Sequence, residues 1–338
     1  MLSLKPGFAT LSLRQKGRVL LLGLFLCTLL LPLTLFSGKV QAGIPVKSAI
    51  VLNMTTGRIL YQKNADLRIP PASLTKVMTS MLVHDALAEG RLTRNTRVRI
   101  PREAARVGGS TMNLRAGERV TVSQLLQGTI ISSGNDAATA LALKVSGRQR
   151  PFVNAMNTRA RRLGMKGTVF KNPTGLPAAG QLTTARDMMR LASAYLRKYP
   201  SAARIHAMDS YVFHGRTHPT TNPFLGSRGV NGLKTGFTQA SGYNIILTTQ
   251  RGNNKILIVL LGARTKTKRS VAGNILLTAA HKYPNNARLF RQAVDGNSKR
   301  NLVSSERKKI VRKKAHVSKN PKKQPRKSGK TKVRKRRS

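Results

Sequence analysis

Three short polar stretches decide how this sequence is interpreted: Ser73-Leu74-Thr75-Lys76, Ser133-Gly134-Asn135 and Lys234-Thr235-Gly236. Each motif alone is short enough to occur by chance in many proteins. Together, and in this order, they supply a hydroxyl, two amines and an amide, which are the groups of a serine acyl-transfer site. The rest of the chain is therefore interpreted around these three motifs.

We expect Ser73 at the start of a helix, with Lys76 three residues further along the same face. Two prolines before Ser73 disfavour a helix there, and the apolar residues after it recur at helical spacing: Leu74, Val77, Met78, Met81 and Leu82. A lysine can be the base for a serine hydroxyl only if burial or a nearby positive charge, such as that of Lys234, lowers its pKa. The alternative is that Ser73 only caps the helix and Lys76 is a surface lysine.

The second motif falls between two predicted helices. The first opens at Thr121 or Ser123, and the second runs from Asp136 to Val145. A loop between two buried helices is a rigid mount for side chains, whereas glycine and asparagine are also common in ordinary turns. The second motif is therefore either part of a site or only a break between helices.

Two pairs of β-rich runs predict two antiparallel hairpins. The first pair comprises residues 48–53 and 58–63, and the second comprises residues 243–249 and 255–261. A helix from about Lys268 to Tyr283 follows them. We expect the strand that carries Lys234 at a sheet edge beside the Ser73 helix, where an extended peptide can pair with it.

The motifs and their flanking residues resemble the low-molecular-mass penicillin-binding proteins of the D-alanyl-D-alanine carboxypeptidase type, peptidase family S11. The resemblance covers residues 43 to about 286, and the flanking residues that carry it are Pro71-Ala72, Asp136-Ala137-Ala138, Asn172-Pro173-Thr174-Gly175-Leu176 and Gly232-Leu233. It implies an α+β fold of the serine β-lactamase/transpeptidase type. In this fold an antiparallel sheet is flanked by helices, and a helical subdomain carries the second motif.

The resemblance implies three catalytic residues. Ser73 attacks the peptide carbonyl, Lys76 takes its proton, and Ser133 passes a proton between Lys76 and the leaving amine. Asn135 binds the substrate amide and steadies Lys76.

The resemblance also implies how the substrate is held, by Asn135 together with Lys234, Thr235, Gly236, Phe237 and Arg269. The backbone N–H groups of Ser73 and Phe237 form an oxyanion hole, and Lys234 and Thr235 meet the anionic end of the substrate. An arginine after the next strand binds the terminal carboxylate, and its register favours Arg269 over Arg264.

The implied activity is that of a serine-type D-Ala-D-Ala carboxypeptidase that trims peptidoglycan stem pentapeptides through a Ser73 acyl-enzyme, with no metal and no cofactor. β-Lactams are expected to be covalent inhibitors, because the sequence has no Glu between Glu118 and Glu306 to hydrolyse them as class A β-lactamases do. Two alternatives remain. One is a D,D-endopeptidase that cuts peptidoglycan cross-links with the same residues, and the other is a catalytically dead, cationic protein that binds the cell wall.

The first 42 residues have the layout of a secretory signal peptide. Basic residues precede an apolar run from Val19 to Phe36, and small or aliphatic residues stand before a cleavage point after Ala42. The alternative is an uncleaved membrane anchor. Cys27, the only cysteine, lies inside this run. We therefore expect an exported protein at the periplasm or the extracytoplasmic face of the cell envelope.

The 338-residue chain is strongly cationic, with 62 Lys and Arg against 10 Asp and Glu and a formal net charge of +52. From Lys299 to Ser338 there are nineteen basic residues and one acid. We expect a catalytic domain over residues 43–290 and a disordered basic tail over residues 291–338, with a transient helix near residues 305–315. Such a tail suits anionic envelope polymers or lipid headgroups. Export makes nucleic acid an unphysiological partner.

Overall fold

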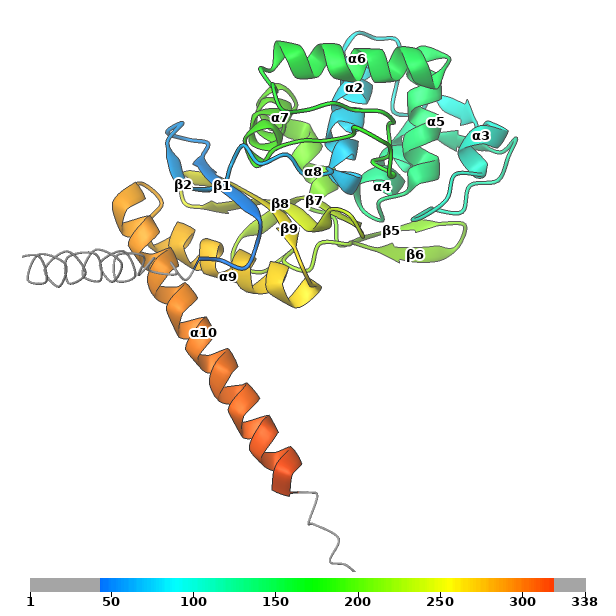
Figure 1. The fold of residues 1–338 in the computed structure, drawn as a ribbon. Helices are drawn as coiled ribbons and strands as arrows, with labels where there is room; N and C mark the ends of the chain where they lie inside the picture. Colours follow the sequence, from blue (N-terminus) through cyan, green and yellow to red (C-terminus); the bar gives the residue numbers. More distant parts are fainter. Residues whose placement is uncertain (1–42, 319–338) are drawn as a thin grey trace, which may run out of the picture. The chain divides into compact units, whose positions relative to one another are not determined.

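The structure, a computed structural model, describes the backbone of residues 43–318 and the side chains of residues 43–301 and Ser304. A five-stranded antiparallel sheet of order β2-β1-β9-β8-β7 lies at its centre (Figure 1). Its strands are β1 (Ser48–Asn53), β2 (Ile59–Lys63), β7 (Val230–Thr238), β8 (Gly242–Arg251) and β9 (Asn254–Ala263). Both predicted hairpins are confirmed, and β7, which carries the third motif, is an edge strand as predicted.

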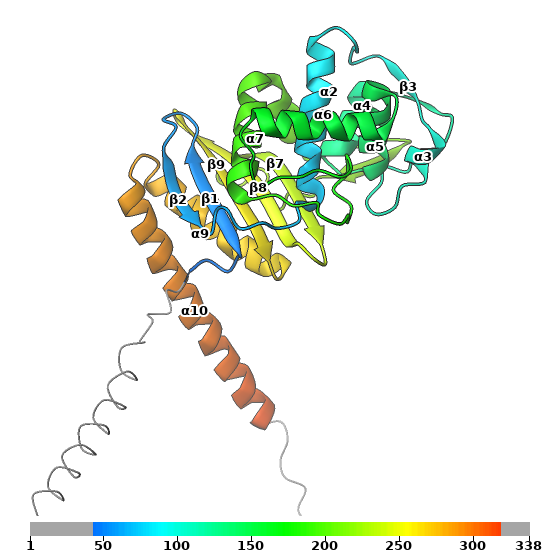
Figure 2. The same ribbon diagram turned by 45° about the horizontal axis from the view of Figure 1, so that its top comes forward.

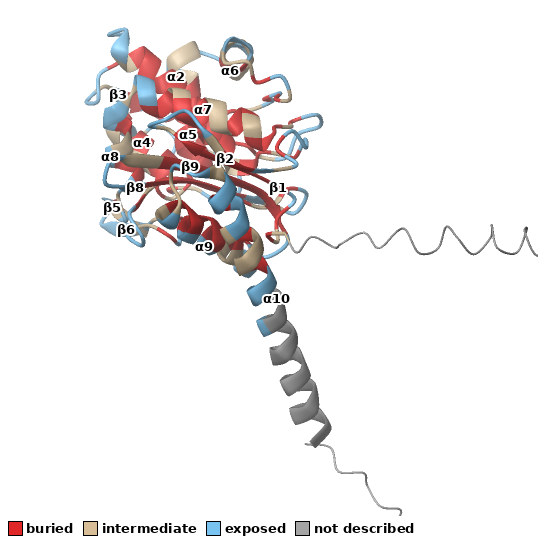
Figure 3. Cartoon of the chain, turned by 90° about the vertical axis from the view of Figure 1, so that its left-hand side faces the viewer, coloured by how far each residue is buried: buried red, intermediate tan, exposed pale blue. Residues whose placement is uncertain are grey.

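Helices cover both faces of this sheet because the central strands are apolar on both sides. Along β9, Leu257, Val259 and Leu261 pack into one core cluster and Ile256, Ile258 and Leu260 pack into another. The first cluster joins the sheet to α2 (Lys76–Ala88), α6 (Gln149–Arg162) and α7 (Ala185–Lys198), and the second joins it to α9 (Lys266–Lys282) and α10 (Ala287–Ser318). Figure 2 shows the two sets of helices on either side of the sheet, and Figure 3 shows the buried residues in each layer. The α+β fold predicted from the sequence is therefore confirmed.

A helical subdomain is built around α2, which is buried on nearly every side from Lys76 to Ala86. It includes α4 (Val122–Ile130) and α5 (Asn135–Ser146), with Thr121 capping α4 through a reciprocal pair of hydrogen bonds with Gln124. Small elements that the sequence did not predict complete this part of the chain. They are α3 (Arg102–Ala105), η3 (Pro200–Ala202), α8 (Ala203–His206) and the hairpin of β5 (Ser210–Phe213) and β6 (Arg216–Pro219). The two short strands β3 (Arg97–Arg99) and β4 (Arg119–Thr121) also pair with each other.

Helix α10 crosses the boundary expected at residue 290, where the sequence predicts the start of a disordered tail. Phe290 and Val294 are fully buried in the cluster beneath the sheet, and Ser298 is buried one turn further on. These positions repeat every four residues, so one face of the helix packs although its composition is dominated by basic residues. This finding corrects the expected boundary, because packed structure extends to Ser298.

Two predictions fall on other parts of the chain. The expected signal peptide, residues 1–42, and the last twenty residues of the basic tail lie outside the described residues. Between residues 43 and 318, no helix has both the length and the apolar composition that crossing a membrane requires.

Candidate active site

Ser73 lies in η2 (Ala72–Thr75), a short 3-10 turn that leads directly into α2. The helix start predicted here is confirmed, and neither η2 nor α2 has a side-chain hydrogen bond to its first residues. Ser73 is therefore not a capping serine. Ala72, which precedes it, has φ 50°, a left-handed conformation that is unusual for a residue with a side chain.

Lys76 lies at the first position of α2, and its amine faces the Ser73 hydroxyl. The Lys76 Nζ atom lies 3.0 Å from Ser73 Oγ, 2.7 Å from Asn135 Oδ1 and 2.8 Å from the carbonyl oxygen of Thr174. The last two oxygens can only accept, so they take both N–H groups of a neutral amine. The remaining lone pair of the amine is then directed to the Ser73 hydroxyl.

The surroundings of Lys76 favour its neutral form. The side chain is completely buried, and this burial, together with the positive charge of Lys234, holds the pKa of Lys76 well below its usual range, while Asp136 opposes the shift. The alternative in which Lys76 is a surface lysine is therefore wrong. The amine has the geometry that a general base requires, and its lowered pKa favours the neutral form that can accept a proton.

The second motif is held by the loop that precedes α4. Asn135 donates from Nδ2 to the carbonyl oxygen of Gly108 at 2.6 Å, which orients its Oδ1 toward Lys76, and its backbone N–H donates to the carbonyl oxygen of Ser110 at 2.7 Å. Asp136 accepts backbone N–H groups from Met112 and Leu114 at 3.0–3.1 Å. The second motif and the loop at residues 108–114 therefore hold each other in place, although the sequence analysis assigned this loop no role.

The third motif brings β7 against the turn that carries Ser73. A Cβ atom on Gly236 would lie 3.1 Å from the backbone nitrogen of Ser73, so this close approach depends on glycine. Lys234 is buried, and burial lowers its pKa to about 7. Thr235 donates from its hydroxyl to that of Thr221 at 2.7 Å.

An aromatic pair and an arginine stand at the far end of β7. Phe237 is 53% exposed and stacks on Tyr243 with 4.3 Å between ring centroids. The guanidinium of Arg269 lies 5.9 Å from the centroid of Tyr243. Arg269 is buried and lines the cleft, whereas Arg264 lines a neighbouring hollow on the other side of Phe237 and Tyr243, which belong to both linings.

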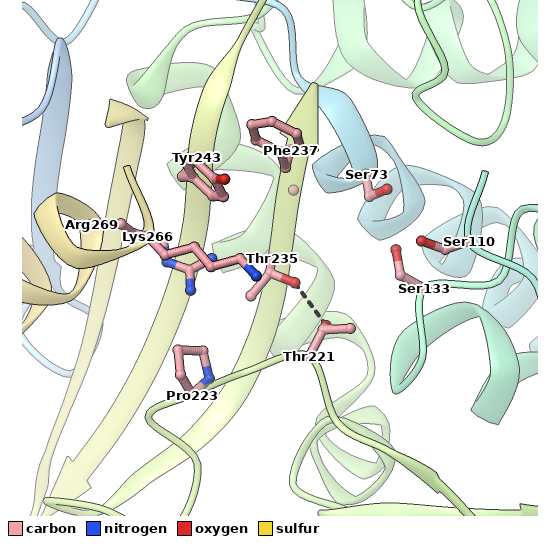
Figure 4. Close-up of a pocket in the computed structure, with 11 residues that line it drawn as sticks. Ser73, Ser110, Ser133, Thr221, Pro223, Thr235, Phe237, Tyr243, Lys266 and Arg269 are labelled. Atoms are coloured by element: carbon pink, nitrogen blue, oxygen red, sulfur yellow. Dashed lines mark hydrogen bonds between the residues drawn. The ribbon is translucent and has the colours of Figure 1, made fainter. Parts of the chain in front are cut away.

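These groups surround one cleft of about 620 Å³. Figure 4 shows the hydroxyls of Ser73, Ser110 and Ser133 close together on one side, with Thr235 and Phe237 on β7 and Arg269 on α9 across from them. The lining residues are Ser73, Ser110, Ser133, Thr221, Pro223, Thr235, Gly236, Phe237, Tyr243, Lys266 and Arg269. Asn135, Lys76 and Lys234 lie beneath this lining, in the buried part of the site. None of the lining residues is an acid.

Several residues of the site were missed in the sequence. Ser110, Thr221, Tyr243 and Lys266 line the cleft, and the Thr174 carbonyl holds Lys76, although the sequence analysis assigned none of these residues a role in the site. The one signal that could have found Thr174 is its place in a stretch that carries the family resemblance. Between residues 43 and 301, no group of His, Cys, Asp and Glu side chains could hold a metal ion.

Two buried polar residues hold α2 and β7, the elements that carry site residues, to their neighbours, and sequence reasoning assigned them no role either. Asp85, on the helix of Lys76, accepts hydrogen bonds from Arg159 and Lys198, each at 2.7 Å. His206 Nδ1 lies 2.9 Å from the carbonyl oxygen of Leu233, and burial lowers the pKa of His206 to about 3. A neutral histidine that donates from Nδ1 therefore fixes the strand immediately before Lys234.

Comparison with known proteins identifies relatives of this chain. Residues 37–265 match the family described as D-alanyl-D-alanine carboxypeptidase, peptidase S11. The chain is 38% identical over 230 residues to the D-alanyl-D-alanine carboxypeptidase DacF of Bacillus subtilis, covering 66% of this chain and 59% of that relative. It is 34% identical over 240 residues to the D-alanyl-D-alanine endopeptidase of Pseudomonas aeruginosa, covering 66% of this chain and 75% of that relative.

Solved structures show the same fold. Penicillin-binding protein 5 of Haemophilus influenzae superposes with a TM-score of 0.69 and 34% identity over 71% of each chain. Penicillin-binding protein D2 of Listeria monocytogenes, in its cefotaxime-bound form, superposes with a TM-score of 0.64 and 30% identity, covering 70% of this chain and 96% of that one. The chain spans about 60% of the length of the curated carboxypeptidases that it matches.

Gly175 offers a test of how the nucleophile is positioned. It has φ 83°, and a Cβ atom there would lie 1.8 Å from the carbonyl oxygen of Ala72. Gly175→Ala should therefore displace the turn that carries Ser73, and we expect acylation by a fluorescent penicillin to slow by about 100-fold, as a misplacement of about 1 Å can do.

The matched control is Gly180→Ala. Gly180 has φ 73°, a similar backbone strain, but the nearest atom to a Cβ at this position would be Lys171 Cε at 3.7 Å. We expect this variant to label at nearly the rate of the unmodified protein. Equal rates for the two variants would contradict a role for the contact between Gly175 and Ala72.

Proposed function

The chain belongs to the peptidase S11 family of D-alanyl-D-alanine carboxypeptidases, and from that premise we propose that it removes the terminal D-alanine of peptidoglycan stem pentapeptides through an acyl-enzyme on Ser73. The single observation that carries this proposal is the buried Lys76 amine 3.0 Å from the Ser73 hydroxyl. A serine is a weak nucleophile without an adjacent base. A neutral, desolvated amine at hydrogen-bond distance supplies that base.

In the first step, Ser73 Oγ attacks the carbonyl carbon of the penultimate D-alanine while Lys76 takes the hydroxyl proton. The backbone N–H groups of Ser73 and Phe237 stabilise the negative charge that forms on the carbonyl oxygen. The proximity of Gly236 to the Ser73 nitrogen supports this role, because it brings β7 close to η2. Preorganised donors of this kind are worth about 3–4 kcal/mol each in acyl transfer.

The C–N bond of the terminal residue then breaks, and Ser133 passes the proton from Lys76 to the leaving amine. Ser133 lines the same cleft as Ser73 and stands with φ 67° at the break between α4 and α5. Asn135 binds the substrate amide while its Oδ1 holds Lys76. Water resolves the acyl-enzyme, and Lys76 again accepts and returns the proton.

The free carboxylate of the terminal residue is held by Lys234, Thr235 and Arg269. Arg269 packs against Tyr243 and lines the cleft, and no acid stands in that lining, so a carboxylate in the cleft would supply the counter-charge of its guanidinium. β-Lactams carry a comparable carboxylate, and the relative from Listeria monocytogenes is known with cefotaxime bound. We therefore expect β-lactams to acylate Ser73 as covalent inhibitors.

A D,D-endopeptidase is the second candidate. The similarity to the endopeptidase of Pseudomonas aeruginosa favours it, and the same residues would cut a cross-link whose leaving group is larger than D-alanine. The cleft volume of about 620 Å³ accommodates either leaving group. Either reaction places the protein outside the cytoplasmic membrane, where peptidoglycan lies.

Product analysis separates these functions. The unmodified protein should be labelled by fluorescent penicillin and should release D-alanine from a stem pentapeptide faster than it cleaves a cross-linked dimer. The Ser73→Ala variant should show no labelling, no D-alanine release and no cleavage of the dimer. Faster cleavage of the dimer would make the endopeptidase the correct function. A folded protein without label or product would leave only a cell-wall binding role.

The pH dependence of acylation follows from the two buried lysines. The second-order rate constant should rise with pH as Lys76 loses its proton, because only the neutral amine can accept one. It should fall again above about pH 7, because Lys234, whose pKa burial lowers to about 7, loses the charge that attracts the carboxylate.

Lys234→Arg is the matched variant for this profile, since a guanidinium stays charged throughout the range. In this variant we expect the decrease of the acylation rate constant at high pH to begin more than about two pH units higher, whatever the absolute rate. A decrease that begins at the same pH would assign it to another group and would remove the Lys234 charge from the mechanism.

We propose that the basic carboxyl end holds the enzyme to anionic envelope polymers or lipid headgroups. Nineteen basic residues between Lys299 and Ser338 support this role. A chain that ends at Ser298 retains every residue of α10 that is described as buried, and it should dissociate from isolated cell walls at a lower salt concentration than the full chain. The same salt dependence for both proteins would contradict the proposal.

A further inference from the structure

The end of the cleft formed by α9 carries an unusual concentration of positive charge. Helix α9 is capped by Thr265, whose hydroxyl accepts from the backbone of Lys268, and its first four residues are Lys266-Thr267-Lys268-Arg269. There is no acid in this first turn. The N-terminus of a helix already bears partial positive charge, so three cations there cost stability. A local arrangement that is unfavourable for the helix points to a functional use.

Two of these three cations face the cleft. Lys266 and Arg269 line it, whereas Lys268 does not. Figure 4 shows the Lys266 side chain extending over β7 toward Thr235, with the guanidinium of Arg269 beside it. Both cationic groups therefore reach the region in which the terminal carboxylate of the substrate is proposed to bind.

Nothing in the lining of the cleft neutralises this pair. None of its eleven lining residues is Asp or Glu. Arg269 is only 7% exposed, and among the described residues its Nε is without a hydrogen-bond partner. With no acid in the lining, an anionic ligand is the expected partner of the guanidinium where it meets the cleft.

We propose that Lys266 is a second substrate-binding cation, which holds the terminal carboxylate of the substrate jointly with Arg269. This inference rests on the proposed function and adds a residue to it. The buried Arg269, packed against Tyr243, fixes the direction of the carboxylate through its planar donors. Lys266 is exposed, and its flexible ammonium contacts the same carboxylate from the side that faces solvent.

A cation that contacts the carboxylate equally in the ground state and the transition state changes binding rather than chemistry. Lys266→Ala should therefore raise KM for a peptide that ends in D-Ala-D-Ala by about three- to fivefold, the upper part of the range for an exposed ion pair, and should leave kcat within about twofold. Lys266→Arg should restore most of the loss. Folding is not at risk, because removing a cation from the first turn favours the helix.

Lys268→Ala is the matched control. It removes the same charge from the same helical turn, but its side chain does not line the cleft, so KM should remain within about twofold of the original. If Lys266→Ala and Lys268→Ala behave alike, the effect is one of general charge and the proposal is wrong.

A double-mutant cycle with Arg269→Ala tests whether both cations hold one group. We expect the loss from Lys266→Ala to change by at least about threefold when Arg269 is absent, because residues that share a partner are coupled. Additive losses would mean that Lys266 holds another part of the substrate and would overturn the proposal. If the unmodified protein releases no D-alanine, the proposed function fails by itself, and the same cycle measured on penicillin acylation of Ser73 still tests the carboxylate site.

Discussion

The whole site depends on one constraint, which is the complete removal of the Lys76 amine from water. An isolated ammonium in such a place is very unfavourable, so the structure favours the neutral amine. Asn135 and the Thr174 carbonyl then fix its two N–H groups and leave its lone pair for Ser73. Four separate parts of the chain must meet for this to happen: η2 with α2, the start of α5, the turn at residues 172–175, and β7.

The electrostatics of the cleft divide its cations into two kinds. Lys76 lies deep in the site, where burial and the positive charge of Lys234 hold its pKa well below the ordinary value. Arg269 lines the cleft itself, and burial lowers its pKa as well. Because the ordinary pKa of a guanidinium is very high, Arg269 remains charged. Asp136 is close enough to oppose the shift of Lys76, but its oxygens already accept backbone N–H groups. The proposed base and the charged guanidinium of Arg269 therefore belong to the same site, which suits the proposed substrate, a peptide with a free carboxylate.

The sequence predicted the parts of this arrangement that are carried by side-chain identity. The three motifs, the helix after Ser73 and the edge position of β7 follow from residue types and their spacing. The Thr174 carbonyl could not be predicted in the same way, because a backbone oxygen has no residue signature and its position depends on the tertiary contact of Gly175 with Ala72. Asp85 was equally hidden, since a buried acid on an apolar helix is recognised only when its cationic partners on α6 and α7 are known. The packed part of α10 was missed because two apolar residues, Phe290 and Val294, are few against a basic background.

The ionisation of Lys76 is the most direct test of this account. In protein labelled with ¹³C at the lysine Cε, surface lysines should titrate near their ordinary pKa of about 10.4. We expect the resonances of Lys76 and Lys234 to titrate well below this value, and one of the two to disappear in the Lys76→Met variant. If every lysine resonance titrates near the ordinary value, the amine beside Ser73 is charged at neutral pH and cannot accept the serine proton, and the account is wrong.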